Sequence, residues 1–323
     1  MSFVEDALKF HAEHNGMLAV ASKVPLNNRE DLALAYTPGV AEPCKAIKEN
    51  KELSFEYTCR GNTVAIVSDG TRVLGLGDIG PEAAMPVMEG KAVLFKTFGD
   101  VDAIPICIDT KDPEEIIETV RRLQPTFAGI NLEDFSSPKC YEIEDRLREI
   151  CDIPVFHDDQ HGTAIACLSA VMGALRYVKK DIKDVKVVVN GCGAAGSAIG
   201  RLFVSMGFPN VIMVERVGAL YKGIDAKLDK IQRYLSEVTN PNMEKGTLAE
   251  VAKGADILVG VSGPNLFTKE IIGSMADKAI VFGLANPVPE TSYEAAIAAG
   301  AAVAGTGRSD SPCTCFQIFA AMI

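Results

Sequence analysis

The sequence predicts an α/β protein with an N-terminal α/β domain followed by a Rossmann-type NAD(P)-binding domain. Apolar runs typical of buried strands alternate with helical patterns, which indicates parallel sheets. Acidic pairs end two of these runs, and a glycine-rich loop joins a later strand to a helix. At 323 residues the chain exceeds the usual size of one domain. We place the domains at residues 1–160 and 161–323.

Charge and composition exclude several classes of partner. The formal charge of −11 opposes binding to nucleic acid or to anionic membranes. The nine cysteines contain no Cys-x-x-Cys motif and favour a reducing compartment. The sequence shows no signal-peptide pattern and no apolar run with the length of a membrane span. We therefore expect a cytoplasmic protein.

Hydrophobic patterns define the elements of the first domain. Strands are expected at 63–67 and 72–76, joined as a hairpin across an Asp-Gly turn. The later elements are expected, in order, as a helix near 86–98, a strand at 103–109, a helix at 114–123, strands at 127–132 and 153–156, and an apolar helix at 164–178.

Two acidic pairs follow predicted strands. Glu133 and Asp134 come after residues 127–132, and Asp158 and Asp159 come after residues 153–156. Ligands bind at the carboxyl ends of strands in open α/β proteins, so the pairs indicate a metal site made of carboxylates. The alternative is that Asp159 or Thr163 caps the following helix while the other acids are ordinary surface groups.

A dinucleotide-binding loop lies between a strand at 185–189 and a helix at 194–206. Its first glycine permits the tight turn, its second admits the pyrophosphate, and its third allows the helix to pack closely. The expected cofactor-binding residues are Gly191, Gly193, Ala194, Ala195 and Gly196.

Glu215 ends the next strand, residues 210–215, where a carboxylate accepts hydrogen bonds from ribose hydroxyls and favours NAD. The neighbouring Arg216 leaves NADP open, because a guanidinium can bind a 2′-phosphate. A second glycine pattern, residues 75–80, is followed by Pro81 without an immediate helical pattern. We interpret it as a turn that shapes a substrate pocket.

Other candidate residues have two interpretations each. Lys91 lies between apolar neighbours and suits a general base, or it is an ordinary helix lysine with its charge in water. Tyr36, beside a Pro-Gly turn, donates a proton or packs its ring under the turn. His157 and His161 have zinc-like spacing but straddle a strand end, which argues against ligation.

Six motifs together resemble the short bacterial malic enzymes. They are residues 36–40, 68–78, 89–91, 131–135, 155–163 and 284–287. The resemblance implies oxidation and decarboxylation of L-malate to pyruvate and CO2 with NAD or NADP, and with Mg2+ or Mn2+. It also implies decarboxylation of oxaloacetate as a partial activity, and a homodimer whose N-terminal helices pack across the subunit interface.

The resemblance also implies roles for single residues. Glu133, Asp134 and Asp159 would bind the metal, and Lys91 would take the hydroxyl proton, directly or through Asp158. Tyr36 would protonate the carbon that loses CO2. Two further residues would contact the substrate, Arg72 through a carboxylate and Asn286 near the nicotinamide.

After Asp310 the sequence departs from the family, because residues 311–323 replace its usual Asn pair and final helices. We expect a C-terminally incomplete domain that binds metal and nucleotide but turns over malate weakly. Three alternatives remain: a nucleotide-binding protein without activity, a shikimate-type or amino-acid dehydrogenase without a metal, and a malolactic-type enzyme that releases lactate.

Overall fold

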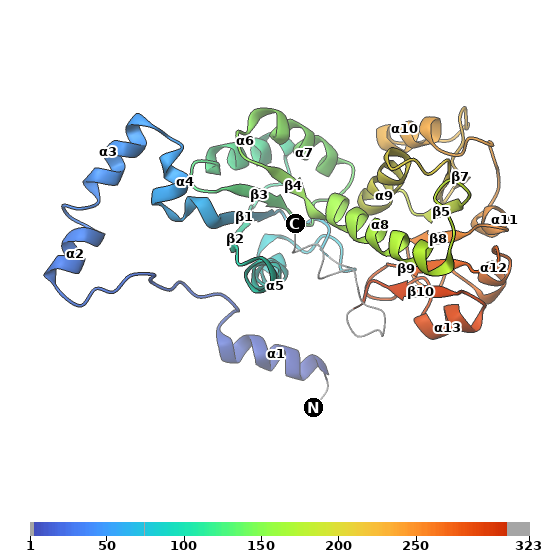
Figure 1. Ribbon diagram of the computed structural model, residues 1–323, viewed down its shortest axis with the longest axis horizontal. Coiled ribbons are helices and arrows are strands. Elements are labelled where there is room, and N and C mark those ends of the chain that lie inside the picture. Colours follow the sequence, from blue (N-terminus) through green and yellow to red (C-terminus); the bar gives the residue numbers. More distant parts are fainter. Residues whose placement is uncertain (1–2, 74, 309–323) are drawn as a thin grey trace. The chain divides into compact units, whose positions relative to one another are not determined.

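The computed structural model describes residues 3–73 and 75–308, which form two compact units (Figure 1). The first holds a four-stranded sheet and the second a six-stranded sheet. The first unit comprises Met1–Gly70, Ile79–Glu133 and Asp145–Val155, and the second comprises Thr71–Asp78, Asp134–Glu144 and Phe156–Ile323.

Four helices precede the first sheet, and no residue of these helices is buried. They are α1 (Phe3–His14), α2 (Arg29–Ala35), α3 (Ala41–Glu49) and α4 (Leu53–Tyr57). We call residues 3–57 the N-terminal arm. Helix α2 begins where the Asn28 side chain accepts the backbone N–H of Asp31 at 2.8 Å. A short 3-10 helix, η1 (Cys59–Asn62), links the arm to the first strand.

The first sheet has the strand order β2-β1-β3-β4, and β1 is parallel to both β2 and β3. The strands are β1 (Thr63–Ser68), β2 (Asp102–Cys107), β3 (Gly129–Leu132) and β4 (Val155–His157). The intervening helices are α5 (Pro81–Gly99), α6 (Pro113–Leu123) and α7 (Lys139–Ile150). This order sets the end of β3 beside the end of β4, where the two acidic pairs follow.

The second sheet has the order β10-β9-β8-β5-β6-β7, the Rossmann order when β5 is counted first. Its strands are β5 (Lys186–Asn190), β6 (Asn210–Glu215), β7 (Gly218–Ala219), β8 (Ile257–Gly260), β9 (Ile280–Gly283) and β10 (Val303–Thr306). Strands β5, β6, β8, β9 and β10 run parallel to their neighbours in this order, whereas β7 pairs antiparallel with β6. The helices are α8 (Asp158–Val178), α9 (Ala194–Ser205), α10 (Lys230–Val238), α11 (Leu248–Ala252), α12 (Lys269–Gly273) and α13 (Tyr293–Ala298).

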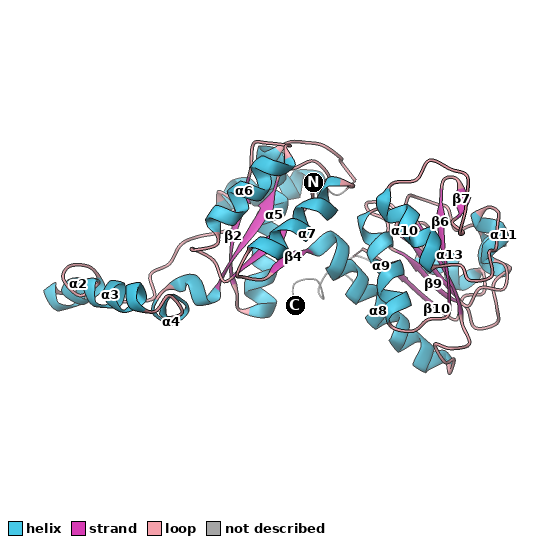
Figure 2. Ribbon diagram, turned by 90° about the horizontal axis from the view of Figure 1, so that it is seen from above, coloured by secondary structure: helices cyan, strands magenta, loops and turns pink. Residues whose placement is uncertain are grey.

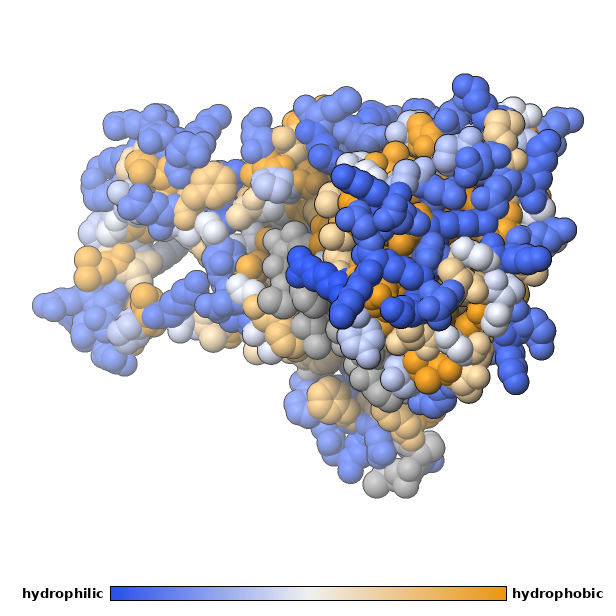
Figure 3. Space-filling model, turned by 45° about the vertical axis from the view of Figure 1, so that its right-hand side comes forward, coloured by the Kyte–Doolittle hydropathy of each residue, from blue (hydrophilic) through white to orange (hydrophobic). Residues whose placement is uncertain are grey.

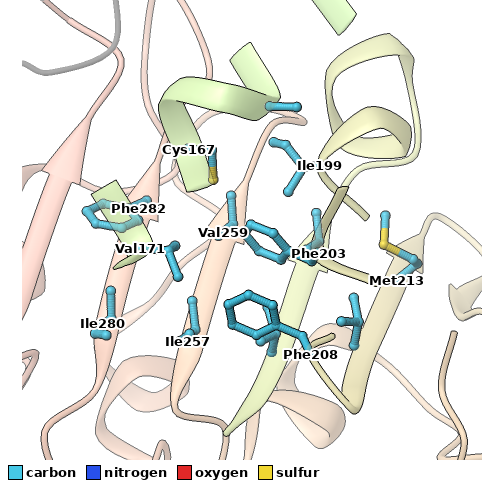
Figure 4. Packing of buried hydrophobic residues seen from close by; sticks show 14 of the residues in the cluster. Cys167, Val171, Ile199, Phe203, Phe208, Met213, Ile257, Val259, Ile280 and Phe282 are labelled. Atoms are coloured by element: carbon cyan, nitrogen blue, oxygen red, sulfur yellow. The ribbon is translucent and has the colours of Figure 1, made fainter. Parts of the chain in front are cut away.

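Helices cover both faces of the second sheet, as its continuously apolar strands predict (Figure 2). Val187 and Val189 pack with residues of α8, α9 and α10, whereas Val188 packs with residues of α11, α12 and α13. Figure 4 shows the first of these cores, in which Phe203 and Phe208 stack with ring centroids 5.0 Å apart. This core fixes the strands and helices that flank the glycine-rich loop, Gly191 to Gly196.

Three predictions about local structure are wrong. Residues 72–76 form no strand at the positions described, since Val73 makes only an isolated bridge to Gly77. Helix α5 begins at Pro81 rather than near 86, so a helix does follow the glycine turn at 75–80; proline suits the first helical position. Helix α8 begins at Asp158 rather than 164, which places the second acidic pair in its first turn.

The seven cysteines that the structure describes are free. Within residues 3–73 and 75–308, no helix is long and apolar enough to cross a membrane. The predictions about residues 309–323 lie outside the described residues.

Candidate metal and nucleotide sites

Three carboxylates meet where β3 and β4 end. Glu133, Asp134 and Asp159 each offer an oxygen, and these oxygens lie within 4.8 Å of one another. Glu133 and Asp134 are buried, and Asp159 is partly exposed. The structure therefore brings three of the four acids of the two pairs together at one edge, and their role as metal ligands stays a prediction. Asp158, also buried, precedes Asp159 in α8.

Hydrogen bonds orient the carboxylates of Glu133 and Asp159 and hold the backbone of Asp134. Glu133 Oε2 accepts the Asn131 side-chain amide at 2.8 Å. Asp159 Oδ2 accepts the backbone N–H of Asp134 at 2.9 Å and lies 3.2 Å from Nε2 of the buried His157. Asp134 has a φ of 58°, a left-handed conformation that Asp tolerates better than most residues. The bond from Asp159 therefore holds Asp134 in place, and Asp159 does not act as the helix cap, which is His157.

Lys91 approaches the carboxylates from α5. Its Nζ lies 3.1 Å from Glu133 Oε1, and the two side chains are only 13% and 7% exposed. The same helix buries Met88 and Ala92 against the sheet, which turns Lys91 inward. The interpretation of Lys91 as an ordinary helix lysine with its charge in water is therefore wrong.

The cluster fits a hard divalent cation. Three carboxylates held this close, two of them buried, repel one another unless positive charge compensates them. Lys91 supplies one positive charge, and carboxylate oxygens are the ligands that Mg2+ and Mn2+ prefer. In the part of the chain that the structure describes, the cluster contains carboxylates and no histidine.

A buried carboxylate that the sequence did not reveal supports the start of α8. Glu144 accepts the His157 backbone N–H at 3.1 Å and Gln160 Nε2 at 2.9 Å, and it lies 2.7 Å from His161 Nε2. Burial raises the pKa of Glu144, but its bonds to His161 and to the His157 backbone outweigh burial, so the pKa is lowered. In the sequence, the available sign of this role was that Glu144 lies among the apolar positions of α7.

Replacing Glu144 by Gln should destabilise the fold, because one amide oxygen cannot serve three donors. We expect a loss of about 1–3 kcal/mol for each donor left without an acceptor. The pKa of Glu144 in the folded protein is below its ordinary value of 4.5, so the carboxylate stabilises the wild type fully above that pH. This stabilisation is lost as the pH falls through the pKa of the folded state. In urea unfolding, the free energy of unfolding should fall less with decreasing pH for the variant than for the wild type. Equal loss in the exposed Glu149→Gln control would contradict this role.

The glycine loop has the geometry of a dinucleotide site. Gly191 has a φ of 110°, and a Cβ on Gly196 would lie 1.9 Å from the Gly191 carbonyl oxygen. A Cβ on Gly193 would meet no protein atom within 4 Å, so protein packing does not require glycine there. Close approach of a ligand does explain it. Helix α9 then begins with the backbone N–H groups of Ala194 and Ala195, suitable for a pyrophosphate.

Glu215 lies beside this loop. Its Oε2 accepts the backbone N–H of Cys192 at 3.2 Å, and its Oε1 accepts that of Arg216 at 3.1 Å. These bonds hold the carboxylate at the end of β6, where the ribose of a bound dinucleotide is expected. Arg216 is exposed.

Two candidates for substrate contact lie on neighbouring segments. The Arg72 backbone N–H donates to the Asp134 carbonyl at 2.9 Å, and its side chain is exposed. A Cβ on Gly75 would lie 2.4 Å from Pro287 Cδ and 3.1 Å from the carbonyl of Asn286. Gly75, the first residue of the glycine turn, therefore packs closely on the Asn-Pro segment.

A second buried carboxylate, Glu290, was also missed. Its oxygens accept the backbone N–H groups of Ser262 at 2.7 Å and Ala285 at 3.0 Å, which follow β8 and β9. A Cβ on Gly260 would lie 2.5 Å from Glu290 Cδ. In the sequence, the available sign of this close packing was the glycine that ends each of these strands. Glu290 thus shapes the carboxyl edge of the nucleotide-binding sheet.

The structure does not bring Tyr36 to the carboxylates. It follows α2, and its residue is 68% exposed, so its ring is not packed under the turn. Both views show α2 well apart from α5, which carries Lys91 (Figures 1 and 2).

Comparison with known proteins gives a consistent result. The family model described as "Malic enzyme, N-terminal domain" matches residues 15–148, and that described as "Malic enzyme, NAD binding domain" matches residues 160–314. A bifunctional malic/malolactic enzyme of Bacillus subtilis is 50% identical over 97% of this chain and 76% of its own length. An NAD-dependent malic enzyme of Geobacillus stearothermophilus is 52% identical over 92% of this chain, but the match spans only 62% of that protein.

The structure of an NAD-dependent malic enzyme from Thermotoga maritima superposes with a TM-score of 0.92 at 48% identity. The match covers 96% of this chain and 82% of that one.

Proposed function

Because this chain belongs to the malic enzyme family, we propose that it converts L-malate to pyruvate and CO2 while reducing NAD or NADP. The cluster of Glu133, Asp134 and Asp159 beside Lys91 carries the proposal. Hydride transfer alone needs no such cluster, whereas loss of CO2 leaves negative charge on the C2 oxygen that a cation stabilises. Residues 1–160 provide the substrate and metal site, and residues 161–323 bind the nucleotide.

Each candidate residue has a role in this reaction. Glu133, Asp134 and Asp159 would hold the metal, which would supply a Lewis acid for the C2 oxygen. The loop from Gly191 to Gly196 would hold the nicotinamide nucleotide, which would supply the hydride acceptor. Lys91 takes the proton of the C2 hydroxyl, directly or through Asp158. After CO2 leaves, Tyr36 protonates C3. Arg72 and Asn286 hold the substrate, with the guanidinium on a carboxylate.

An assay of the purified chain with malate, Mn2+ and each nucleotide tests the proposal. We expect equal amounts of pyruvate, CO2 and reduced nucleotide, and activity that disappears with chelator and returns with Mn2+. Turnover that chelator does not affect would contradict the metal mechanism. The Bacillus subtilis relative is named as bifunctional, so the products must be identified: lactate without net reduction of nucleotide would show the malolactic reaction instead.

We also propose that this chain prefers NAD and acts in the cytoplasm as a homodimer. Glu215 is held where it repels a 2′-phosphate, so kcat/KM should favour NAD by roughly 10–100-fold. Glu215→Ala should reduce this ratio, while Arg216→Gln should leave it nearly unchanged. A ratio that favours NADP and is lost in Arg216→Gln would show that the arginine determines specificity.

A further inference from the structure

A chain of hydrogen bonds crosses the carboxyl edge of the second sheet. Asn190, the last residue of β5, donates from Nδ2 to Ser262 Oγ at 2.7 Å. The backbone N–H of Ser262, which follows β8, donates to Glu290 Oε1 at 2.7 Å. The backbone N–H of Ala285, which follows β9, donates to Glu290 Oε2 at 3.0 Å. Glu290 therefore ties together the segments that end three adjacent strands.

Close packing keeps this carboxylate away from water. Glu290 is fully buried, and a Cβ on Gly260 would lie 2.5 Å from Glu290 Cδ and 2.6 Å from Phe267 Cζ. Charged and polar residues prevail on the visible surface of the second unit (Figure 3), where water and salt screen their charges. The charge of Glu290 is screened much less, because it lies inside the protein.

The hydrogen bonds around Glu290 are those of an ionised carboxylate. Each of its oxygens accepts a backbone N–H, and Oε1 also lies 3.4 Å from the hydroxyl of Ser262. An ionised carboxylate only accepts hydrogen bonds, whereas a protonated one needs an acceptor for its own hydrogen. These donors are neutral, so they stabilise the negative charge without cancelling it.

The buried charge lies in the half of the sheet that is expected to hold the nicotinamide. A Rossmann sheet has two mononucleotide-binding halves, which meet where the strand order reverses, here between β5 and β8. The glycine loop after β5 suits the pyrophosphate, which leaves the ends of β8 and β9 for the nicotinamide. Ala285, whose N–H bonds Glu290, directly precedes Asn286, the proposed substrate contact.

We propose that Glu290 makes the nucleotide site select the oxidised cofactor, because it fixes a buried negative charge beside the nicotinamide subsite. The nicotinamide ring carries a positive charge in NAD+ and none in NADH, so the carboxylate attracts only the oxidised ring. The cofactor that the reaction consumes then binds more tightly than the one it releases. The inference rests on the proposed function for the choice of a nicotinamide nucleotide as the ligand.

Nucleotide binding to the purified full chain tests the proposal without turnover. Fluorescence titration gives the Kd of NADH, and displacement of NADH gives the Kd of NAD+ and of ADP-ribose, which lacks the nicotinamide ring. Glu290→Gln removes the charge and nearly keeps the size of the side chain. The ratio of the Kd of NADH to the Kd of NAD+ should fall by about 10-fold, the effect of one charge across several ångströms of protein. The Kd of ADP-ribose should not change.

Two variants serve as controls. Glu290→Asp keeps the charge, so the ratio of the two Kd values should stay within about 2-fold of the wild-type ratio while both values rise. Glu244→Gln removes a carboxylate from the amino edge of the same sheet, where Glu244 pairs at 2.7 Å with Lys186, the first residue of β5. This variant should leave the ratio unchanged.

The outcomes separate this inference from the proposed function. An unchanged ratio in Glu290→Gln, or equal weakening of NAD+, NADH and ADP-ribose, would show a structural role alone and overturn the proposal. If Glu290→Gln does not fold, the wild type decides, because tighter binding of NADH than of NAD+ would overturn the proposal. Selective binding of NAD+ without malate turnover would refute the proposed function and leave the inference standing. Turnover with an unchanged ratio would do the reverse.

Discussion

Replacing Asp159 by Asn should abolish malate oxidation while the fold is retained. The amide keeps an oxygen that accepts the Asp134 backbone N–H, now bonded at 2.9 Å, but it removes one of three negative charges from the cluster. We expect Mn2+ affinity to fall by at least about 100-fold, because changes even to residues outside the ligand set cost 10–100-fold. Loss of several kcal/mol of metal stabilisation lowers kcat by roughly three decades or more. Calorimetric titration with Mn2+ measures affinity independently of activity.

The exposed Asp145 on α7 offers a matched control, since Asp145→Asn removes the same charge outside the cluster. This variant should bind Mn2+ as the wild type does. Near-normal turnover of Asp159→Asn at low Mn2+ would refute its assignment as a ligand. Asp159→Ala should in addition lower the thermal midpoint, because Asp134 then loses the acceptor that holds its left-handed backbone.

Features carried by a continuous pattern could be predicted from the sequence. The loop from Gly191 to Gly196 combines strand, turn and helix in one short segment, so its fold follows from local chemistry. The acidic pairs could be placed for a similar reason, because each follows an apolar strand and parallel strands end at one edge. The strand 210–215 was predicted at its observed limits.

Features that depend on contacts distant in sequence could not be predicted. Glu144 meets His161 seventeen positions away, and Glu290 meets Ser262 twenty-eight positions away, so no local motif marks either acid. Helix α8 extends back to Asp158 because acidic residues are favourable in a first turn, although they carry no apolar periodicity. The position of Tyr36 outside the cluster depends on the path of the whole arm, which its motif does not encode.

Replacing Lys91 by Ala should stop turnover but raise the affinity for Mn2+, whereas Asp159→Asn should lower that affinity. The Lys91 ammonium lies 3.1 Å from Glu133 Oε1 and competes with a cation for that carboxylate. Removing it should raise Mn2+ affinity, because the same carboxylates then carry one more uncompensated negative charge. Loss of a general acid–base group typically lowers the rate by about 10²–10⁴-fold. The malate and pyruvate half-reactions should both be impaired, since Lys91 takes a proton in one and returns it in the other.

Two further variants separate the charge of Lys91 from its proton transfer. Lys91→Arg keeps a cation beside Glu133 but cannot lose its proton, so it should be inactive with nearly wild-type Mn2+ affinity. Lys96→Ala, on the exposed side of the same helix, should leave both turnover and affinity unchanged. Activity in Lys91→Arg would exclude Lys91 as the base and leave it only an electrostatic role. Weaker Mn2+ binding in Lys91→Ala would mean that the lysine organises the carboxylates rather than competing with the metal for them.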